Sequence, residues 1–381
     1  MSTTNNLVAL AQAGVSPWLD NLKREMLLDG SGSLKHLIER DGIRGQTSNP
    51  SIFQNAIAKS SIYDQEILSL ARGGVEAEDI VWELMVQDVQ RACDIFRPLY
   101  ESSQRQDGYV SLELNPTLAH ETQASLKQAE ELVARVDRPN LMIKVPATLE
   151  GLPVVEELIA KGVSVNVTLL FSVERYKMVI DAWMRGLERR LEKGESLEGI
   201  ASVASFFISR VDTEADKRLD KAYAADPSLI EKYGDLRGKL AVANACLAYE
   251  LFQQETATPR WQALAAKGAM VQRPLWASTS TKNPAYPDTL YVDELIGPHC
   301  VNTMPDETVA AFADHGKVAV TLTPQAIAKA HQVVEAFAKS GQDLVDVTDN
   351  VLMREGVDKF AVAYRKLVEA VAEKRRQLLA Q

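Results

Sequence analysis

Eight short apolar segments, separated by stretches with helical spacing, constrain the fold of this chain more than any other feature of its sequence. The segments predicted as strands are 15–19, 43–50, 109–114, 141–144, 163–169, 200–208, 270–277 and 300–304. Strands that alternate with helices favour a parallel sheet with helical crossovers. Eight strands are the number that closes a (β/α)8 barrel, and 381 residues suffice for that fold with insertions.

A doubly wound open sheet is the main alternative. That fold usually carries a glycine-rich turn after its first strand to bind a nucleotide, and no G-x-G-x-x-G motif follows residues 15–19. We therefore predict an α/β chain with one (β/α)8 TIM barrel domain over residues 1–381, its barrel core at about 15–304. A mostly helical insertion at 62–104 is expected between the second and third strands, and further helices at about 305–381.

Local signals also predict where some strands and helices end. Pro146 has no N–H to donate, so the fourth strand should end at Lys144. The sixth strand should end in residues 209–210, before a helix that begins at Thr213. The spacing of apolar residues then predicts one helix from about 229 to 254.

The overall charge and the cysteine content narrow the classes of partner. The chain carries 42 Lys and Arg against 52 Asp and Glu, so its net charge is −10. This acidity argues against nucleic acid or an anionic membrane as the main partner, and an anionic substrate must be met by a local group of basic residues. The three cysteines are far apart and lack C-x-x-C spacing, which excludes a disulfide scaffold and fits a reducing cytosol.

The ends of the chain and its apolar runs bear on its location. The first residues lack the basic and apolar regions of a secretory signal. No apolar run reaches the ~20 residues needed to span a bilayer. We therefore expect a cytoplasmic protein without a membrane partner, either a monomer or a homo-oligomer.

Lys144 stands inside the apolar run Leu-Met-Ile-Lys-Val at 141–145. Apolar residues at successive positions indicate a strand that is buried on both faces, as in parallel sheets. An ammonium group there is poorly solvated, which favours the neutral amine. A neutral amine is a nucleophile whose natural partner is a carbonyl, and their product is a Schiff base. The alternative is a lysine whose stem packs while its charged head reaches solvent.

Polar residues gather at or just after the predicted strand ends. They are Asp20, Thr47, Asn49, Glu113, Lys144, Asn166, Thr168, Ser205, Arg210, Ser278 and Ser280. In a barrel these ends converge on one face, where barrel enzymes keep their active sites. Some have simpler explanations alone: Asp20 as a helix N-cap, Asn49 as turn chemistry and Thr168 as a strand former. Glu113 is harder to explain, because a charge on an apolar strand is costly unless it is paired or used.

Two segments closely resemble the signature segments of transaldolases: Thr-Ser-Asn-Pro-Ser-Ile-Phe at 47–53 and Ile-Lys-Val-Pro-Ala-Thr at 143–148. Segment 166–172 resembles a third characteristic segment, and 205–212 resembles the phosphate-binding strand end of that family. The resemblance extends from about residue 15 to residue 303 and so covers the predicted barrel.

This resemblance implies a (β/α)8 barrel that transfers a dihydroxyacetone unit between sugar phosphates, as in the pentose phosphate pathway. Donors would be fructose 6-phosphate and sedoheptulose 7-phosphate. Acceptors would be erythrose 4-phosphate and glyceraldehyde 3-phosphate. The family implies no metal and no organic cofactor.

The resemblance also implies roles for single residues. Lys144 would attack the ketose carbonyl, and Asp20 would take the proton of the C4 hydroxyl. Glu113 and Thr168 would position a water for imine formation and loss. The residues implied to bind substrate are Thr47, Asn49, Asn166, Ser205, Phe207 and Arg210.

The sequence departs from the family pattern near the implied phosphate site. Phe206 and Ser209 stand where the family commonly has Pro and Gly. The seventh strand usually offers an arginine after Ala-Ser, and this chain instead has Ser280 and Lys282, which we assign to that part of the site.

Two other functions stay open at the level of sequence. One is a fructose 6-phosphate aldolase that releases free dihydroxyacetone; those relatives tend to have Gln at the position of Glu113 and Tyr at that of Phe207, so both positions favour transfer. The other is a barrel that binds sugar phosphates without turnover. Lys144 argues against this second function, because burying a lysine that takes no part in a reaction costs free energy without a functional gain.

Overall fold

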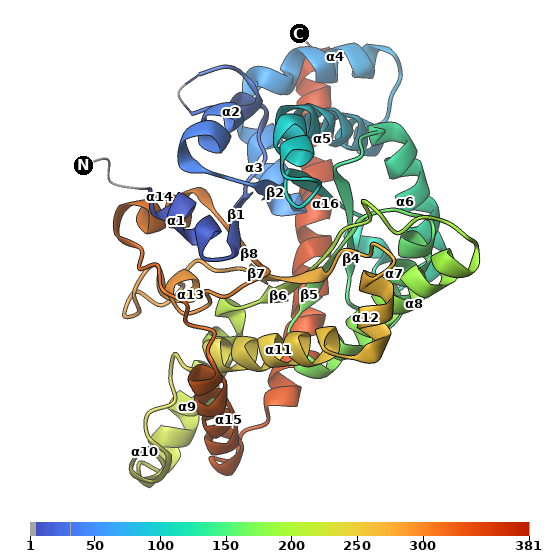
Figure 1. Ribbon diagram of the computed structural model, residues 1–381. Helices are drawn as coiled ribbons and strands as arrows, with labels where there is room; N and C mark the ends of the chain where they lie inside the picture. Colours follow the sequence, from blue (N-terminus) through green and yellow to red (C-terminus); the bar gives the residue numbers. More distant parts are fainter. Residues whose placement is uncertain (1–4, 31, 381) are drawn as a thin grey trace.

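The computed structural model describes residues 5–30 and 32–380 and confirms the predicted barrel (Figure 1). Strands adjacent in sequence are adjacent in the barrel, all pairs are parallel, and β1 closes the barrel against β8. The strands are β1 Val15–Asp20, β2 Gly45–Thr47, β3 Tyr109–Glu113, β4 Leu141–Pro146, β5 Val165–Leu170, β6 Ser202–Phe207, β7 Gln272–Ala277 and β8 Cys300–Met304. Their residues are almost all buried, as expected for parallel strands covered by helices.

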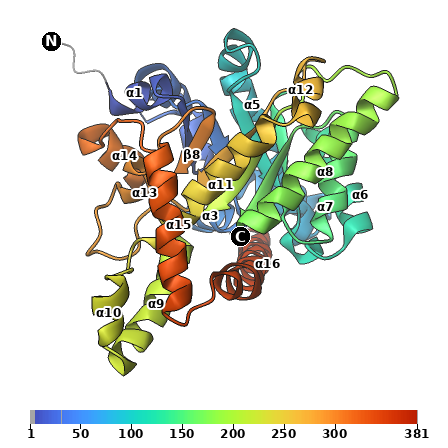
Figure 2. The ribbon, with the colours of Figure 1, turned by 60° about the horizontal axis from the view of Figure 1, so that its bottom comes forward.

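Helices connect the strands and cover the outside of the barrel (Figures 1 and 2). Those up to β8 are α1 Asn6–Gln12, α2 Leu34–His36, α3 Pro50–Lys59, α4 Asp64–Arg72, α5 Ala77–Ser102, α6 Thr122–Val136, α7 Gly151–Ala160, α8 Val173–Glu192, α9 Ser209–Ala225, α10 Ser228–Tyr233, α11 Leu240–Thr256, α12 Pro259–Ala265 and α13 Leu290–Asp293. The predicted insertion between β2 and β3 corresponds to α4 and α5. No helix among the described residues is long and apolar enough to cross a membrane.

The chain continues after β8 with α14 Asp306–His315, α15 Pro324–Lys339 and α16 Met353–Leu379. Figure 2 shows α15 beside α11, on which it packs. Helix α16 packs against α3, α4 and α5, and it also contacts β5. Figure 1 shows α16 (red) running the height of the molecule. This C-terminal helix therefore connects the insertion between β2 and β3 with the barrel.

The prediction that the fourth strand ends at Lys144 is wrong, because β4 continues to Pro146. Pro146 is the register partner of Thr168, and the next N–H, that of Ala147, donates to the Thr168 carbonyl at 2.8 Å. In a parallel ladder alternate residues donate to opposite neighbours, so the missing N–H of Pro146 faces β3, which has already ended at Glu113. The lysine thus lies two residues inside the strand.

Two helix boundaries also differ from the prediction. Ser209 and Arg210 belong to the first turn of α9, because the chain leaves the extended conformation at Ile208, where φ is −100° and ψ is −75°. The helix predicted over 229–254 is divided into α10 and α11. Gly234 interrupts it with a φ of +75°, a backbone conformation that favours glycine.

Gly45 in β2 is required by close packing inside the barrel. A Cβ atom at Gly45 would lie 2.4 Å from the indole ring of Trp18, which is fully buried in β1. The ring therefore occupies the space that any side chain at position 45 would need. This contact fixes β1 and β2 side by side, and both strands lead directly into the residues described below.

We predict that Gly45→Ala destabilises the protein by about 1–3 kcal/mol, the usual cost of overpacking a filled core. Chemical denaturation followed by circular dichroism measures the change. Gly32→Ala is the matched control, because a Cβ at Gly32 would meet nothing within 4 Å. Equal stability of the two variants would contradict the packing argument.

Candidate active site

Lys144 lies in β4 with its side chain directed into a polar cavity at the carboxyl ends of the strands. Its side chain is only 6% exposed. The ammonium group donates to the Ser48 carbonyl at 3.0 Å and to Glu113 Oε2 at 3.3 Å. Glu113 and Lys144 are register partners in the β3–β4 pair, so strand pairing itself places the carboxylate beside the amine. The alternative that the charged head of Lys144 reaches solvent is therefore excluded.

A cavity of about 190 Å³ opens above this lysine. Ten of the twelve residues predicted for the site line it: Asp20, Thr47, Asn49, Lys144, Thr168, Ser205, Phe207, Arg210, Ser280 and Lys282. The other two do not line it but contact residues that do. Glu113 accepts a hydrogen bond from Lys144, and Asn166 accepts one from Ser205. Ser278, one of the polar residues expected at the strand ends, also lines the cavity. The other lining residues were not predicted from the sequence: Ala277, Thr303, Pro305, Glu307 and Phe360.

Asp20 accepts a hydrogen bond from the hydroxyl group of Thr47 on the neighbouring strand. Thr47 Oγ1 lies 2.7 Å from both Asp20 Oδ1 and Thr303 Oγ1, so three strands meet at one hydrogen-bonded chain. Burial raises the pKa of Asp20 above its ordinary value, although the charge of Lys144 and the hydrogen bond from Thr47 oppose the rise. The charge of Lys144 therefore acts on this carboxyl group, while burial favours its protonated form.

Glu113 is 2% exposed, and its surroundings favour the protonated acid. Burial raises its pKa to about 7, while the charge and hydrogen bond of Lys144 lower it. Within residues 5–30 and 32–380, neither Glu113 Oε1 nor Thr168 Oγ1 has a hydrogen-bond partner, although both atoms are buried. A pKa near neutrality allows this carboxyl group to give up or take a proton at physiological pH.

A second polar chain lies behind the cavity on β3, β5 and β6. Asn166 Nδ2 donates to Ser111 Oγ at 3.0 Å, and Ser205 Oγ donates to Asn166 Oδ1 at 2.6 Å. All three side chains are almost completely buried. The network fixes the amide of Asn166 and the hydroxyl of Ser205, so both are held in position before any ligand arrives.

Basic groups gather on the other side of the cavity. Arg210 projects from the first turn of α9, and burial lowers the pKa of its guanidinium from the ordinary value. Arg210 Nη1 is buried without a hydrogen-bond partner among the described residues. Lys282 donates to Ser280 Oγ in the loop after β7, and Ser278 lies 3.0 Å from Ser209 through their hydroxyls. These donors suit a phosphate group.

Asn49 both caps a helix and lines the cavity, two roles that the sequence left as alternatives. Its side chain caps α3 by accepting the Ile52 N–H at 3.1 Å, which is the expected turn chemistry. It also lines the cavity. Among the lining residues not predicted from the sequence, Phe360 gave no local signal.

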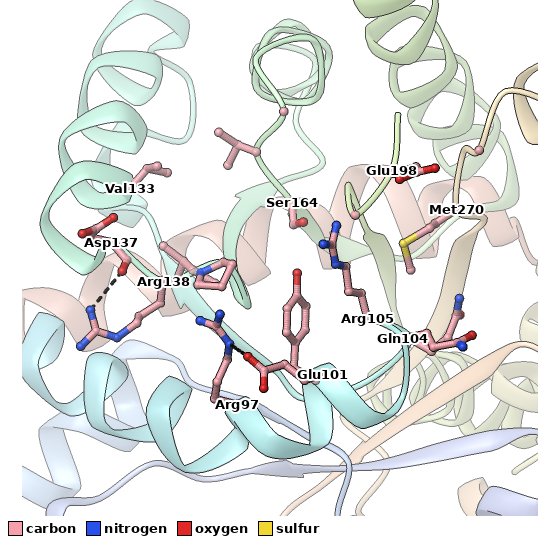
Figure 3. A pocket seen from close by; sticks show the side chains of 18 residues that line it. Arg97, Glu101, Gln104, Arg105, Val133, Asp137, Arg138, Ser164, Glu198 and Met270 are labelled. Atoms are coloured by element: carbon pink, nitrogen blue, oxygen red, sulfur yellow. Dashed lines mark hydrogen bonds and ion pairs between the residues drawn. The ribbon is translucent and has the colours of Figure 1, made fainter. Parts of the chain in front are cut away.

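A larger cavity, of about 890 Å³, lies at the opposite end of the barrel (Figure 3). It is lined by residues such as Leu141 and Ser164 that begin or precede strands, and none of its described lining residues is a lysine. At its edge Arg97 pairs with Glu101 at 2.6 Å, and Figure 3 shows this contact. Barrel enzymes keep their active sites at the carboxyl ends of the strands, so the smaller cavity is the candidate.

The fold and the site define a (β/α)8-barrel protein built around a buried lysine at the carboxyl ends of its strands. Within the part of the chain that the structure describes, no group of three or more His, Cys, Asp or Glu side chains is arranged to hold a metal ion. A family model described as transaldolase/fructose-6-phosphate aldolase matches residues 17–371. The chain belongs to this family.

Curated relatives agree with this assignment. A protein named transaldolase from Saccharopolyspora erythraea is 49% identical, with 98% of each chain covered. A transaldolase from Frankia alni is 48% identical, with 97% of each chain covered. A protein named transaldolase 2 from a Nostoc species is 47% identical at the same coverage.

The buried pair generates a prediction about stability and pH. Lys144→Met removes the charge that lowers the pKa of Glu113, so that pKa should rise further above its ordinary value of 4.5. The folded state then holds the proton more tightly than the unfolded chain, so stability falls as pH rises from about 4.5 through the folded pKa. Denaturation at pH 5.5 and 8.5 should show a steeper loss for Lys144→Met than for wild type.

The control for this prediction is the double variant Lys144→Met/Glu113→Gln, which lacks the titrating carboxyl group. Its pH dependence should lose the additional slope of the single variant. The same slope in both variants would show that Glu113 is not the source.

Proposed function

We propose that the protein is a cytoplasmic transaldolase of the pentose phosphate pathway that transfers a dihydroxyacetone unit through a Schiff base on Lys144. Donors are ketose phosphates such as sedoheptulose 7-phosphate or fructose 6-phosphate, and acceptors are aldose phosphates such as glyceraldehyde 3-phosphate or erythrose 4-phosphate. The observation that carries the proposal is the buried Lys144–Glu113 pair beside Arg210 in one cavity. The free, buried cysteines 93, 246 and 300 support a reducing compartment.

In the first step the Lys144 ammonium gives a proton to Glu113, and the neutral Nζ attacks C2 of the ketose. The carbinolamine then loses water to give a protonated imine. The leaving water needs a proton, and Glu113 is suited to supply it because its pKa is about 7. The partner-free atoms Glu113 Oε1 and Thr168 Oγ1, among the residues described, support the proposal that these two groups hold the water between them.

The imine then acts as an electron sink for cleavage of the C3–C4 bond. Asp20 takes the proton of the C4 hydroxyl, the C4 oxygen becomes an aldehyde, and the bonding electrons form a C2=C3 enamine. The raised pKa of Asp20 suits it to accept that proton. An acceptor aldehyde enters, C3 attacks its carbonyl carbon, and Asp20 returns the proton to the new hydroxyl. Hydrolysis of the imine releases the product ketose and restores Lys144.

The remaining groups of the cavity are proposed to bind the substrate. Thr47, Asn49 and Asn166 offer donors and acceptors to the sugar hydroxyls. Ser205 and Phe207 shape the pocket between them and the phosphate. The phosphate would bind to Arg210, Ser280 and Lys282, which supply the local positive charge that an acidic chain needs for an anionic substrate. Glu113 and Phe207 favour transfer over release of free dihydroxyacetone.

The central test is reductive trapping. Borohydride added with fructose 6-phosphate should fix a three-carbon adduct on Lys144, identified by peptide mass spectrometry. Lys144→Met should give no adduct, while Lys161→Met, which alters a lysine outside the cavity, should label as wild type does. A coupled assay with sedoheptulose 7-phosphate and glyceraldehyde 3-phosphate should then show transfer. An adduct elsewhere, or ligand binding without turnover, would reject the proposal.

A second prediction separates imine formation from carbon–carbon cleavage. Asp20→Asn preserves the shape of the side chain but cannot accept the C4 proton, so turnover should fall by about 10²–10⁴-fold. Lys144 should still form the first imine. Borohydride trapping should therefore recover a six-carbon phosphorylated adduct in place of the three-carbon one. A three-carbon adduct at the wild-type rate would show that another group accepts the proton.

A further inference from the structure

The C-terminal helix α16 supplies one wall of the cavity. Phe360 projects from this helix, is 7% exposed and lines the cavity together with Lys144 and Arg210. Its ring centroid lies 5.8 Å from Lys144 Nζ and 6.0 Å from Arg210 Cζ. One aromatic ring thus faces both the amine and the guanidinium, at distances where a cation is attracted to the ring face.

A second ring lies beside the guanidinium. Phe207 in β6 lies 5.3 Å from Arg210 Cζ, and Phe171 packs against Phe207 with the same distance between ring centroids. Arg210, which is half-buried, therefore lies beside one ring from β6 and one from α16. Phe207 and Phe360 thus line the same cavity as Lys144 and Arg210 and give that side of it an apolar surface.

The position of Phe360 is fixed by contacts on both sides along α16. Toward the N-terminal end, Gly356 lies so close to β5 that an added Cβ would be 3.0 Å from Leu169 Cδ2. Leu169 has a φ of +60° where the register of β5 against β6 shifts, and it directly follows the cavity residue Thr168. Toward the C-terminal end, Lys374 donates to the Ile57 carbonyl at 3.0 Å. The helix that carries Phe360 is therefore held against the barrel on one side of this residue and against α3 on the other.

We propose that Phe360 determines whether the three-carbon adduct on Lys144 is transferred or hydrolysed, by excluding water from the cavity between donor cleavage and acceptor binding. The inference rests on the proposed function and adds to it a specificity-determining residue outside the barrel strands. The cavity must be open enough to exchange one aldose phosphate for another. The ring keeps the adduct covered while that exchange occurs.

The competing reaction defines what the ring must prevent. In the absence of an acceptor, C3 of the enamine takes a proton and the protonated imine forms again. Water then adds to C2, a proton passes to nitrogen, the C–N bond breaks, and free dihydroxyacetone leaves with Lys144 regenerated. Protonation at C3 and addition of water to C2 both draw on solvent, so a smaller side chain at position 360 should favour release.

The test compares the release of free dihydroxyacetone from fructose 6-phosphate with its transfer to erythrose 4-phosphate in the same full-length enzyme. Phe360→Ala should raise the ratio of release to transfer several-fold. Phe360→Leu, which keeps most of the apolar volume, should stay near the wild-type ratio. Val362→Ala is the matched control, because Val362 is 45% exposed on the same helix and does not line the cavity.

An unchanged ratio in Phe360→Ala, with transfer still measurable, would overturn the inference and leave the proposed function intact. Equal ratios in the Ala and Leu variants would also overturn it, because apolar volume would then not control release. A wild-type enzyme that forms no adduct on Lys144 would instead reject the proposed function. Should Phe360→Ala not fold, as judged by circular dichroism, Phe360→Val reduces the same side chain with a smaller cavity and decides the question.

Discussion

The buried contact between Lys144 and Glu113 is the interaction on which the rest of the structure depends. Removing two charged groups from water costs several kcal/mol per ion, and their mutual attraction offsets this only when the geometry is good. The register of β3 against β4 supplies that geometry by placing the two residues side by side. A buried amine with a single carboxylate is also an arrangement in which protons move easily, because burial keeps the pKa of the acid near 7.

The barrel extends the same principle to other strand pairs. Asp20 and Thr47 are register partners in β1 and β2, so a hydroxyl is held against the carboxylate without any loop being involved. The chain of hydrogen bonds continues to Thr303 in β8, where the barrel closes. Groups placed on parallel strands lose little conformational freedom when a ligand binds, because the sheet has already fixed them. The part of the site proposed to bind phosphate differs, since it lies on α9 and on the loop after β7.

The same difference between strands and connecting segments decides which parts of the site can be predicted from the sequence. The strands were predictable because they are short, apolar and regularly spaced, and the lysine and both acids were predictable because they interrupt or end such segments. The beginning of α9 was not, because Ser209 and Arg210 directly follow an apolar strand, and the turn at Ile208 has no glycine or proline to mark it. Phe360 was missed for a different reason. An aromatic residue on an amphipathic helix is ordinary core material, and only the three-dimensional arrangement brings it to the lysine.

The separation of Phe360 from the strands has a physical rationale. The carboxyl ends of the barrel strands present polar side chains, some of which have atoms without a protein partner in the described part of the chain, such as Thr168 Oγ1 and Glu113 Oε1. Each such atom is costly to bury, and the cost is recovered only when a ligand satisfies it. The side chains with which the strand ends line the cavity are mostly polar, so the strands themselves offer little apolar cover there. A helix from outside the barrel resolves this conflict, because it adds apolar surface over the site without displacing any of the groups proposed to react.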